Sequence, residues 1–210
     1  MGFSAIAPLY SFLEKCAFGR RLEETRFAGL DFLTEKLPQD TRVLVVGDGD
    51  GRFTLELVSR RPDLRIDFVE LSEGMLTLAK SKFQKLSSPP HIRWVHQDIR
   101  EWKATEYNLI VTHFFLDCFS PAELPSLVED LKNKIALGGY WLHSDFSPST
   151  GIWARALLKT MYLFFRLTAG LKTRQLLKPQ PLFRGYSLEL IFQFSQAKDF
   201  IYSEIWRKNL

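Results

Sequence analysis

The sequence predicts an α/β fold: a doubly wound sheet, mostly parallel, with helices on both faces and an antiparallel C-terminal strand. Three observations predict it. Short apolar runs alternate with segments of helical periodicity from about residue 42 to residue 144, an order typical of a parallel sheet with crossover helices. The first run ends in three alternating glycines, between Gly47 and Gly51, and the second ends in a carboxylate, Glu70. Two last apolar runs, separated by a short polar stretch, favour a closing antiparallel hairpin.

The segment before the first strand has helical spacing. Its apolar residues recur every three or four positions between 3 and 36, which predicts one or two helices with a break at Gly19. Pro38 then marks a turn. The elements expected after it are a strand at about 42–46, a helix at about 51–60, a strand at about 65–70, a helix from Ser72 to about 86, and strands at about 92–96 and 107–112.

Capping and turn residues place the later elements. Ser72 suits the cap of its helix. Ser120, followed by a proline and then by Glu123, predicts the start of a helix that runs to about 136. The glycine pair at 138–139 predicts a turn into a fifth strand. The remaining expected elements are that strand at 140–144, a helix at 153–171, a loop at 172–184, and hairpin strands at 186–195 and 200–206.

Length and composition predict a single domain over residues 1–210, with 1–38 as an N-terminal helical cap and 149–185 as a helical insertion. Hydrophobic residues make up 46% and charged residues 25%, which is ordinary for a soluble protein. The net charge of +4 is modest, so no nucleic-acid partner is expected. Two cysteines, no signal-like N-terminus and no bilayer-length apolar run favour a cytoplasmic protein.

The spacing of the glycines distinguishes between classes of nucleotide ligand. A dinucleotide-binding loop has its third glycine three positions after the second, and Arg52 stands at that position here. The loop is therefore a poor match to a pyrophosphate site, which disfavours a nicotinamide enzyme. Glycines still let the backbone approach a ligand closely, and a carboxylate about twenty residues later is suited to the hydroxyls of a ribose.

From about residue 40 to residue 206 the chain resembles the class I S-adenosylmethionine-dependent methyltransferases, which have a Rossmann-like fold. The resemblance lies in the order and spacing of five segments: 47–51, 69–76, 96–100, 111–117 and 137–141. It implies S-adenosylmethionine as the cofactor, with Glu70 on the ribose, Asp98 on the adenine amino group and Ile99 on the adenine ring. The implied cofactor-binding residues are Gly47, Asp48, Gly49, Gly51, Glu70, Leu71, Met75, Asp98, Ile99, His113 and Tyr10.

The chain departs from the family pattern at Val45, where the family has an acidic residue two positions before the first glycine. The resemblance implies that this departure weakens a contact to the amino group of the cofactor. Asp48 and Asp50 are the nearby candidates to replace it.

Three residues are candidates for a general base: His113 after the fourth strand, Asp117 just beyond it, and His143 in the fifth strand. Methyl transfer does not require a base, because the sulfonium is already an activated donor and alignment of the reactants supplies much of the catalysis. No combination of residues predicts a metal site.

The acceptor is expected to be a small, apolar or aromatic molecule, since residues 153–171 are apolar nearly all round and suit a lid over the pocket. The alternatives for this stretch are ordinary core and, given the basic residues that follow it, transient contact with a membrane surface. Two alternatives to the function remain open: a catalytically silent binding module with this fold, and an RNA or protein methyltransferase.

Overall fold

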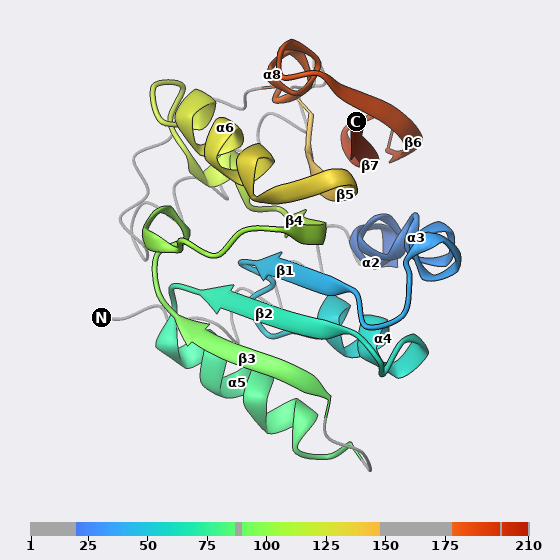
Figure 1. Cartoon of the computed structure of the whole chain (residues 1–210), viewed down its shortest axis with the longest axis vertical. Coiled ribbons are helices and arrows are strands. Elements are labelled where there is room, and N and C mark those ends of the chain that lie inside the picture. The colour runs from blue at the N-terminus through green and yellow to red at the C-terminus, as the bar shows by residue number, and fades with distance from the viewer. Residues whose placement is uncertain (1–19, 87–89, 148–177, 198, 210) are drawn as a thin grey trace.

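The computed structural model describes residues 20–86, 90–147, 178–197 and 199–209. One sheet of seven strands, in the order β3-β2-β1-β4-β5-β7-β6, runs through this part of the chain (Figure 1). The pairs from β3 to β5 are parallel, and β5, β7 and β6 pair antiparallel. The strands are β1 (Arg42–Val46), β2 (Arg65–Glu70), β3 (His91–His96), β4 (Tyr107–His113), β5 (Ile135–Phe146), β6 (Leu188–Gln196) and β7 (Ile201–Lys208). The expected mostly parallel sheet with an antiparallel end is confirmed.

Helices cover both faces of the sheet, as expected. Side chains of α3 (Leu30–Lys36), α4 (Arg52–Arg60) and α5 (Glu73–Phe83) form one buried cluster with strand residues such as Val43 and Phe68. Helices α6 (Leu124–Lys134) and α8 (Gln180–Gly185) form a second cluster on the opposite face, around Trp141 and Trp206. Strand β1 contributes side chains to both clusters, because its side chains alternate between the two faces of the sheet.

The N-terminal segment contains two helices in its described part, α2 (Arg20–Phe27) and α3. They are separated at Gly29, whose φ is +80°. A Cβ at this position would lie 2.8 Å from Cδ1 of Ile205 in β7, so a glycine is needed both for the turn and for the close approach to the sheet. The predicted break at Gly19 lies outside the described residues.

Three expected boundaries are wrong. The helix predicted from Ser120 begins at Leu124, because residues 121–123 form a turn in which the Glu123 carboxylate accepts from the Ser120 nitrogen and hydroxyl. Strand β5 begins at 135, and the glycine pair at 138–139 lies within it, where its pairing with β4 is irregular. Within the predicted loop at 172–184, α8 begins at Gln180: the two prolines there occupy its start, where no N–H donor is needed.

Candidate functional site

The predicted cofactor residues follow neighbouring strands at one edge of the sheet. Val46 pairs with Val69 of β2 and with Thr112 of β4, so the glycine loop after β1 lies between the ends of these two strands. Glu70 ends β2 and pairs with His96, which ends β3. The carboxyl edge of a parallel sheet is where open α/β folds bind their ligands. The residues that the sequence singled out at 47–51, 70, 98 and 113 are therefore brought to a common edge.

The three glycines of the loop share a backbone conformation but differ in what surrounds them. All have positive φ, between +60° and +73°. A Cβ at Gly47 would lie 2.6 Å from Cδ2 of Phe115, and one at Gly51 would lie 3.1 Å from Cβ of Ala79, so these two positions are closed by packing. A Cβ at Gly49 would meet no atom within 4 Å. The backbone at Gly49 thus faces open space, which leaves room for a ligand to approach it closely.

Glu70 holds the loop in place from the end of β2. Its Oε2 accepts from the Gly49 nitrogen at 3.2 Å, and its Oε1 accepts from the Ser72 nitrogen at 2.8 Å. The residue is only 9% exposed, and burial raises the pKa of its carboxyl. A carboxylate offers about four acceptor positions, and backbone donors take two of these. The remaining positions are those that ribose hydroxyls would use.

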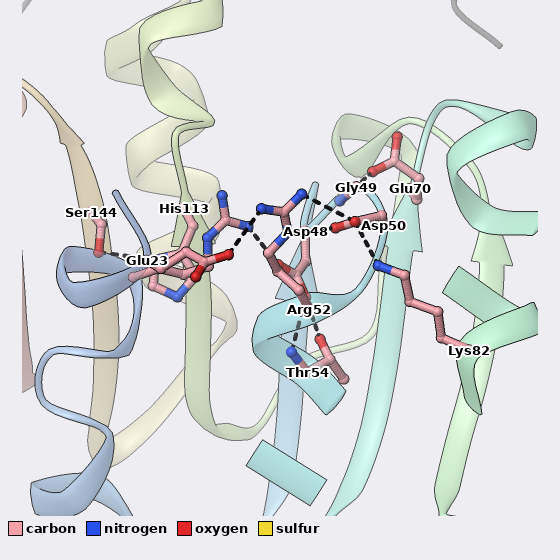
Figure 2. A network of polar contacts seen from close by, with 11 residues as sticks. Glu23, Asp48, Gly49, Asp50, Arg52, Thr54, Glu70, Lys82, His113 and Ser144 are labelled. Carbon is pink, nitrogen blue, oxygen red and sulfur yellow. Dashed lines mark hydrogen bonds and ion pairs between the residues drawn. The ribbon is translucent and has the colours of Figure 1, made fainter. Parts of the chain in front are cut away.

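Asp48 and Asp50 do not serve as spare acceptors, although both are in the loop (Figure 2). Asp48 is 4% exposed; its Oδ2 accepts from the nitrogen and the hydroxyl of Thr54, and its Oδ1 lies 3.5 Å from Nη1 of Arg26. Asp50 is paired with Arg52 at 3.0 Å and with Lys82 at 2.5 Å. Val45, at the position of the family's acidic residue, is fully buried in the core. Neither aspartate is therefore placed to replace an acid at position 45.

The side chains expected around the adenine lie in different environments. Leu71 is 66% exposed directly after Glu70, as an apolar wall for a ring would be. Met75 and Ile99 are buried, and Ile99 packs in the cluster beneath α6. The Asp98 carboxylate accepts from the Arg100 backbone nitrogen at 2.9 Å and is paired with its guanidinium, which lowers its pKa. Tyr10 lies outside the described residues.

His113 ends β4 with its ring buried. Its Nδ1 lies 2.9 Å from the Ser144 hydroxyl, and its ring centroid lies 4.4 Å from that of Phe53. Its Nε2 is buried without a hydrogen-bond partner. Burial, and then the positive charge of Arg26, hold the pKa of His113 well below its usual value, so the ring is neutral.

Phe114, the next residue, has a φ of +51°, a strained conformation for a bulky side chain. Strain of this kind is common at functional sites, where the surrounding structure maintains it. Here it turns the chain sharply at the end of β4, directly after His113.

The two other candidate bases differ in accessibility. His143 is fully buried, and both of its nitrogens have partners: Thr112 Oγ1 at 3.2 Å and Tyr202 Oη at 3.0 Å. His143 thus lies in the interior rather than at the edge of the sheet, and this burial lowers its pKa to about 3. Asp117 lies in a short 3-10 helix, 116–118, and donates its backbone N–H to Oδ2 of the buried Asp145 at 3.1 Å. Burial raises the pKa of the Asp117 carboxyl to about 6.

Comparison with known proteins points to a methyltransferase. Residues 43–139, which include the glycine loop, Glu70, Asp98 and His113, match a family model described as a methyltransferase domain. The matched segment, a little under half of the chain, is thus similar to a methyltransferase domain. The open backbone at Gly49 and the spare acceptor positions of Glu70 fit the adenosyl group of S-adenosylmethionine.

Solved structures of methyltransferases have the same fold as this chain. The N-methyltransferase NodS from Bradyrhizobium japonicum WM9, in complex with S-adenosyl-L-homocysteine, has a TM-score of 0.66 at 16% identity; the match covers 91% of this chain and 88% of that one. Magnesium protoporphyrin IX methyltransferase from Synechocystis PCC 6803, with the same compound bound, has a TM-score of 0.68 at 17% identity and covers 89% and 83%.

Curated relatives match a shorter part of the chain. A malonyl-[acyl-carrier protein] O-methyltransferase from Paenibacillus sp. (strain JDR-2) is 27% identical over 116 residues, which are 53% of this chain and 41% of that protein. A polyamine aminopropyltransferase from Prochlorococcus marinus (strain MIT 9312) is 24% identical over 143 residues, 63% of this chain and 50% of that protein. The match thus spans half or less of these relatives.

Sequence reasoning missed several polar residues that shape this candidate site. Arg26 reaches the loop from α2, and Ser144, Asp145 and Ser203 lie in strands otherwise rich in apolar residues. No local sequence motif marks Arg26, because its partner Asp48 is 22 positions away. Asp145 lies just beyond the expected end of the fifth strand. The sequence signal that could have located Asp145 is its spacing from Trp141 and His143, because residues two apart in a strand lie on the same face.

The described residues show no group of three or more histidine, cysteine, aspartate or glutamate side chains arranged to hold a metal ion. Among the same residues, no helix has the length and apolarity needed to cross a bilayer.

Proposed function

We propose that this chain transfers the methyl group of S-adenosylmethionine to a small, apolar or aromatic acceptor. The observation that carries the proposal is the link between Glu70 and Gly49. The carboxylate accepts from the Gly49 nitrogen and keeps acceptor positions for a ribose, while the same glycine faces open space. A ribose that binds Glu70 would therefore lie directly against the loop, as an adenosyl ligand requires.

Aromatic side chains at the carboxyl ends of β4 and β5 support an apolar acceptor. Phe114 and Phe146 have ring centroids 5.1 Å apart, as do Phe115 and Phe119. Phe146 is the last residue of β5, and the other three come shortly after β4. One structural neighbour is named as a magnesium protoporphyrin IX methyltransferase, and another, an O-methyltransferase family 2 protein, is in complex with apigenin. Both compounds are aromatic, which favours the same class of acceptor.

We also propose that the segment after β5, within residues 149–185, forms a lid over the acceptor. Its side chains, Trp153, Leu157, Met161, Phe164 and Phe165, lie outside the described residues. The segment leaves the sheet after Phe146, at the carboxyl end of β5, and the chain returns at α8. That starting point is beside the aromatic residues after β4, so a lid would cover an acceptor bound there. Within the predicted 149–185 insertion, α8 packs on the sheet, so the lid is proposed for the part before it.

The bound cofactor would supply an electrophilic methyl group, and the chain would supply alignment and, where the acceptor must lose a proton, a base. Asp117 is the best suited of the three candidates for that base. A pKa of about 6 leaves its carboxyl largely ionised at neutral pH and still basic enough to take a proton. His143 has no free nitrogen for this role.

The test is a transfer assay with S-adenosylmethionine labelled in its methyl group. The protein is incubated with a panel of phenols, quinols and fatty acids, and separately with RNA and with a protein extract. We expect label in the organic-extractable fraction, and we expect Glu70→Ala to reduce it by at least about tenfold when the cofactor is below saturation. Label found only on RNA or protein, or no transfer to any acceptor by a protein that binds the cofactor, would contradict the proposal.

A further inference from the structure

A chain of hydrogen bonds fixes which nitrogen of His113 carries its proton. The Ser203 hydroxyl donates to the Ala28 carbonyl at 3.5 Å, and the Ser144 hydroxyl donates to the Ser203 hydroxyl at 2.8 Å. Each hydroxyl has one proton. Ser144 therefore has only an acceptor position left for His113, so Nδ1 of the neutral ring is the protonated nitrogen, and Nε2 presents a lone pair.

That lone pair is buried and unused. Nε2 of His113 has no hydrogen-bond partner, and a buried polar atom of this kind destabilises the fold unless something else satisfies it. By contrast, the other buried histidine, His143, has a partner on each nitrogen. The arrangement at His113 thus maintains a neutral acceptor, at a cost in stability, at the end of β4.

The position of this acceptor relates it to the glycine loop. Val46 pairs with Thr112, so the next residue of each strand, Gly47 and His113, lie at the same level of the sheet. Glu70 and His113 lie on opposite sides of the loop (Figure 2). A ligand whose ribose binds Glu70 and whose other end extends along the strand ends, past β1, reaches β4 at His113.

The other end of S-adenosylmethionine is an α-amino acid, whose ammonium group needs acceptors for three N–H donors. The two carboxylates of the loop itself are already committed: Asp48 to Thr54 and Arg26, and Asp50 to Arg52 and Lys82. Val45 offers none. A second cation at His113 would repel the ammonium, whereas a neutral ring with a lone pair at Nε2 attracts it.

We propose that Nε2 of His113 accepts a hydrogen bond from the α-ammonium group of the bound cofactor, with Ser144 and Ser203 as positioning residues that hold the ring in the required tautomer. The inference rests on the proposed function, since it assigns a further contact to the same cofactor. Arg26 on α2 contributes a positive charge that acts on the His113 ring, and Asp48 lies 3.5 Å from Arg26 and opposes that charge.

The test compares two ligands that differ by one group. Binding of S-adenosylhomocysteine and of its deamino analogue, which lacks only the ammonium, is measured by calorimetry with the full chain. In the unaltered protein S-adenosylhomocysteine should bind more tightly. His113→Phe should reduce this preference by about tenfold or more, because a charge-assisted hydrogen bond is lost. His113→Gln, whose side-chain oxygen is an acceptor, should restore part of it.

His143→Phe is the matched control, since it alters an equally buried histidine, and it should change the binding of both ligands alike. Ser144→Ala should reduce the preference without removing the ring, and nitrogen NMR should show loss of the single Nδ1–H tautomer. This variant keeps the test decisive should His113→Phe fail to fold. An unchanged ligand preference in His113→Gln, His113→Phe and Ser144→Ala would overturn the inference alone. Failure of the unaltered protein to bind either ligand would overturn the proposed function with it.

Discussion

The Asp48 carboxylate caps helix α4 through Thr54. Oδ2 of Asp48 accepts from the Thr54 nitrogen at 2.9 Å and from its hydroxyl at 2.8 Å, and the pair is buried. Thr54 is the third residue of α4, so this contact satisfies one of the unpaired N–H groups at the start of the helix. The middle of the glycine loop is therefore fastened to the helix that follows it.

We predict that Asp48→Ala destabilises the fold by about 3–5 kcal/mol. The substitution leaves the buried Arg26 charge without its carboxylate and the Thr54 donors without an acceptor. Asp50→Ala is the matched control in the same loop. Its pairs with Arg52 and Lys82 are partly exposed, so we expect a loss of about 1 kcal/mol. Urea denaturation measures both, and equal losses would contradict the capping role of Asp48.

Gly49→Ala should impair cofactor binding more than stability. Its φ of +60° makes an alanine strained by about 1–2 kcal/mol, but the new methyl group would meet no protein atom and would occupy the space of the ligand. Gly51→Ala should do the reverse, because its methyl group would press on Ala79 and Phe83 at 3.1 Å. Calorimetry for affinity and thermal unfolding for stability separate the two effects. The prediction fails if both variants bind the cofactor equally well.

Asp98→Ala should weaken cofactor binding only a few-fold, and less than Glu70→Ala. The carboxylate is already paired with Arg100, whose guanidinium is largely exposed. A hydrogen bond from an adenine amino group to this carboxylate therefore contributes less binding free energy than one to an unpaired carboxylate. Arg100→Ala is the useful companion variant, since it should leave binding unchanged or strengthen it. A loss at Asp98 as large as that at Glu70 would show that the adenine depends on this carboxylate.

The stability of the protein should depend on pH through Asp117. Its pKa is raised from 3.8 to about 6 in the folded state, so between these values the native state binds more protons than the unfolded state. This contribution to stability is present below pH 3.8 and is lost as the pH rises through about 6. Asp117→Asn removes this contribution, so the unfolding free energy should fall less steeply between pH 3.8 and about 6. Asp145, whose pKa burial also raises, keeps its own part of the fall. Parallel curves for the two proteins would contradict the raised pKa.

The sequence predicted the parallel part of the sheet well, because its signals are local. An apolar run at 42–46 followed by glycines, and one at 65–70 followed by a helix-capping Ser72, gave strand and helix positions that the structure confirms. The Ser72 hydroxyl does accept from the Met75 nitrogen, at 3.4 Å. The prolines at 179 and 181 were misread, since proline is equally compatible with a loop and with the first turn of a helix.

The chemistry of the site was harder to predict because it depends on contacts between distant residues. Asp48 looked like an acceptor for the cofactor, but Thr54 and Arg26 take its oxygens. His113 and His143 looked alike in the sequence, and only the fold distinguishes a ring with an unused Nε2 from one with two partners. Pairings such as Ser144 with Ser203 arise from strands that are 59 positions apart.

The assignment of the cofactor site is tested most directly by a calorimetric titration of S-adenosylhomocysteine into the unaltered protein and into Glu70→Ala. We predict one binding site of micromolar affinity. We also predict a loss of at least about tenfold in the variant, because hydrogen bonds from the ribose to a charged acceptor contribute roughly 1.5–3 kcal/mol each. A folded protein that binds no S-adenosylhomocysteine, or a Glu70→Ala variant that binds it as tightly as the unaltered protein, would contradict this assignment.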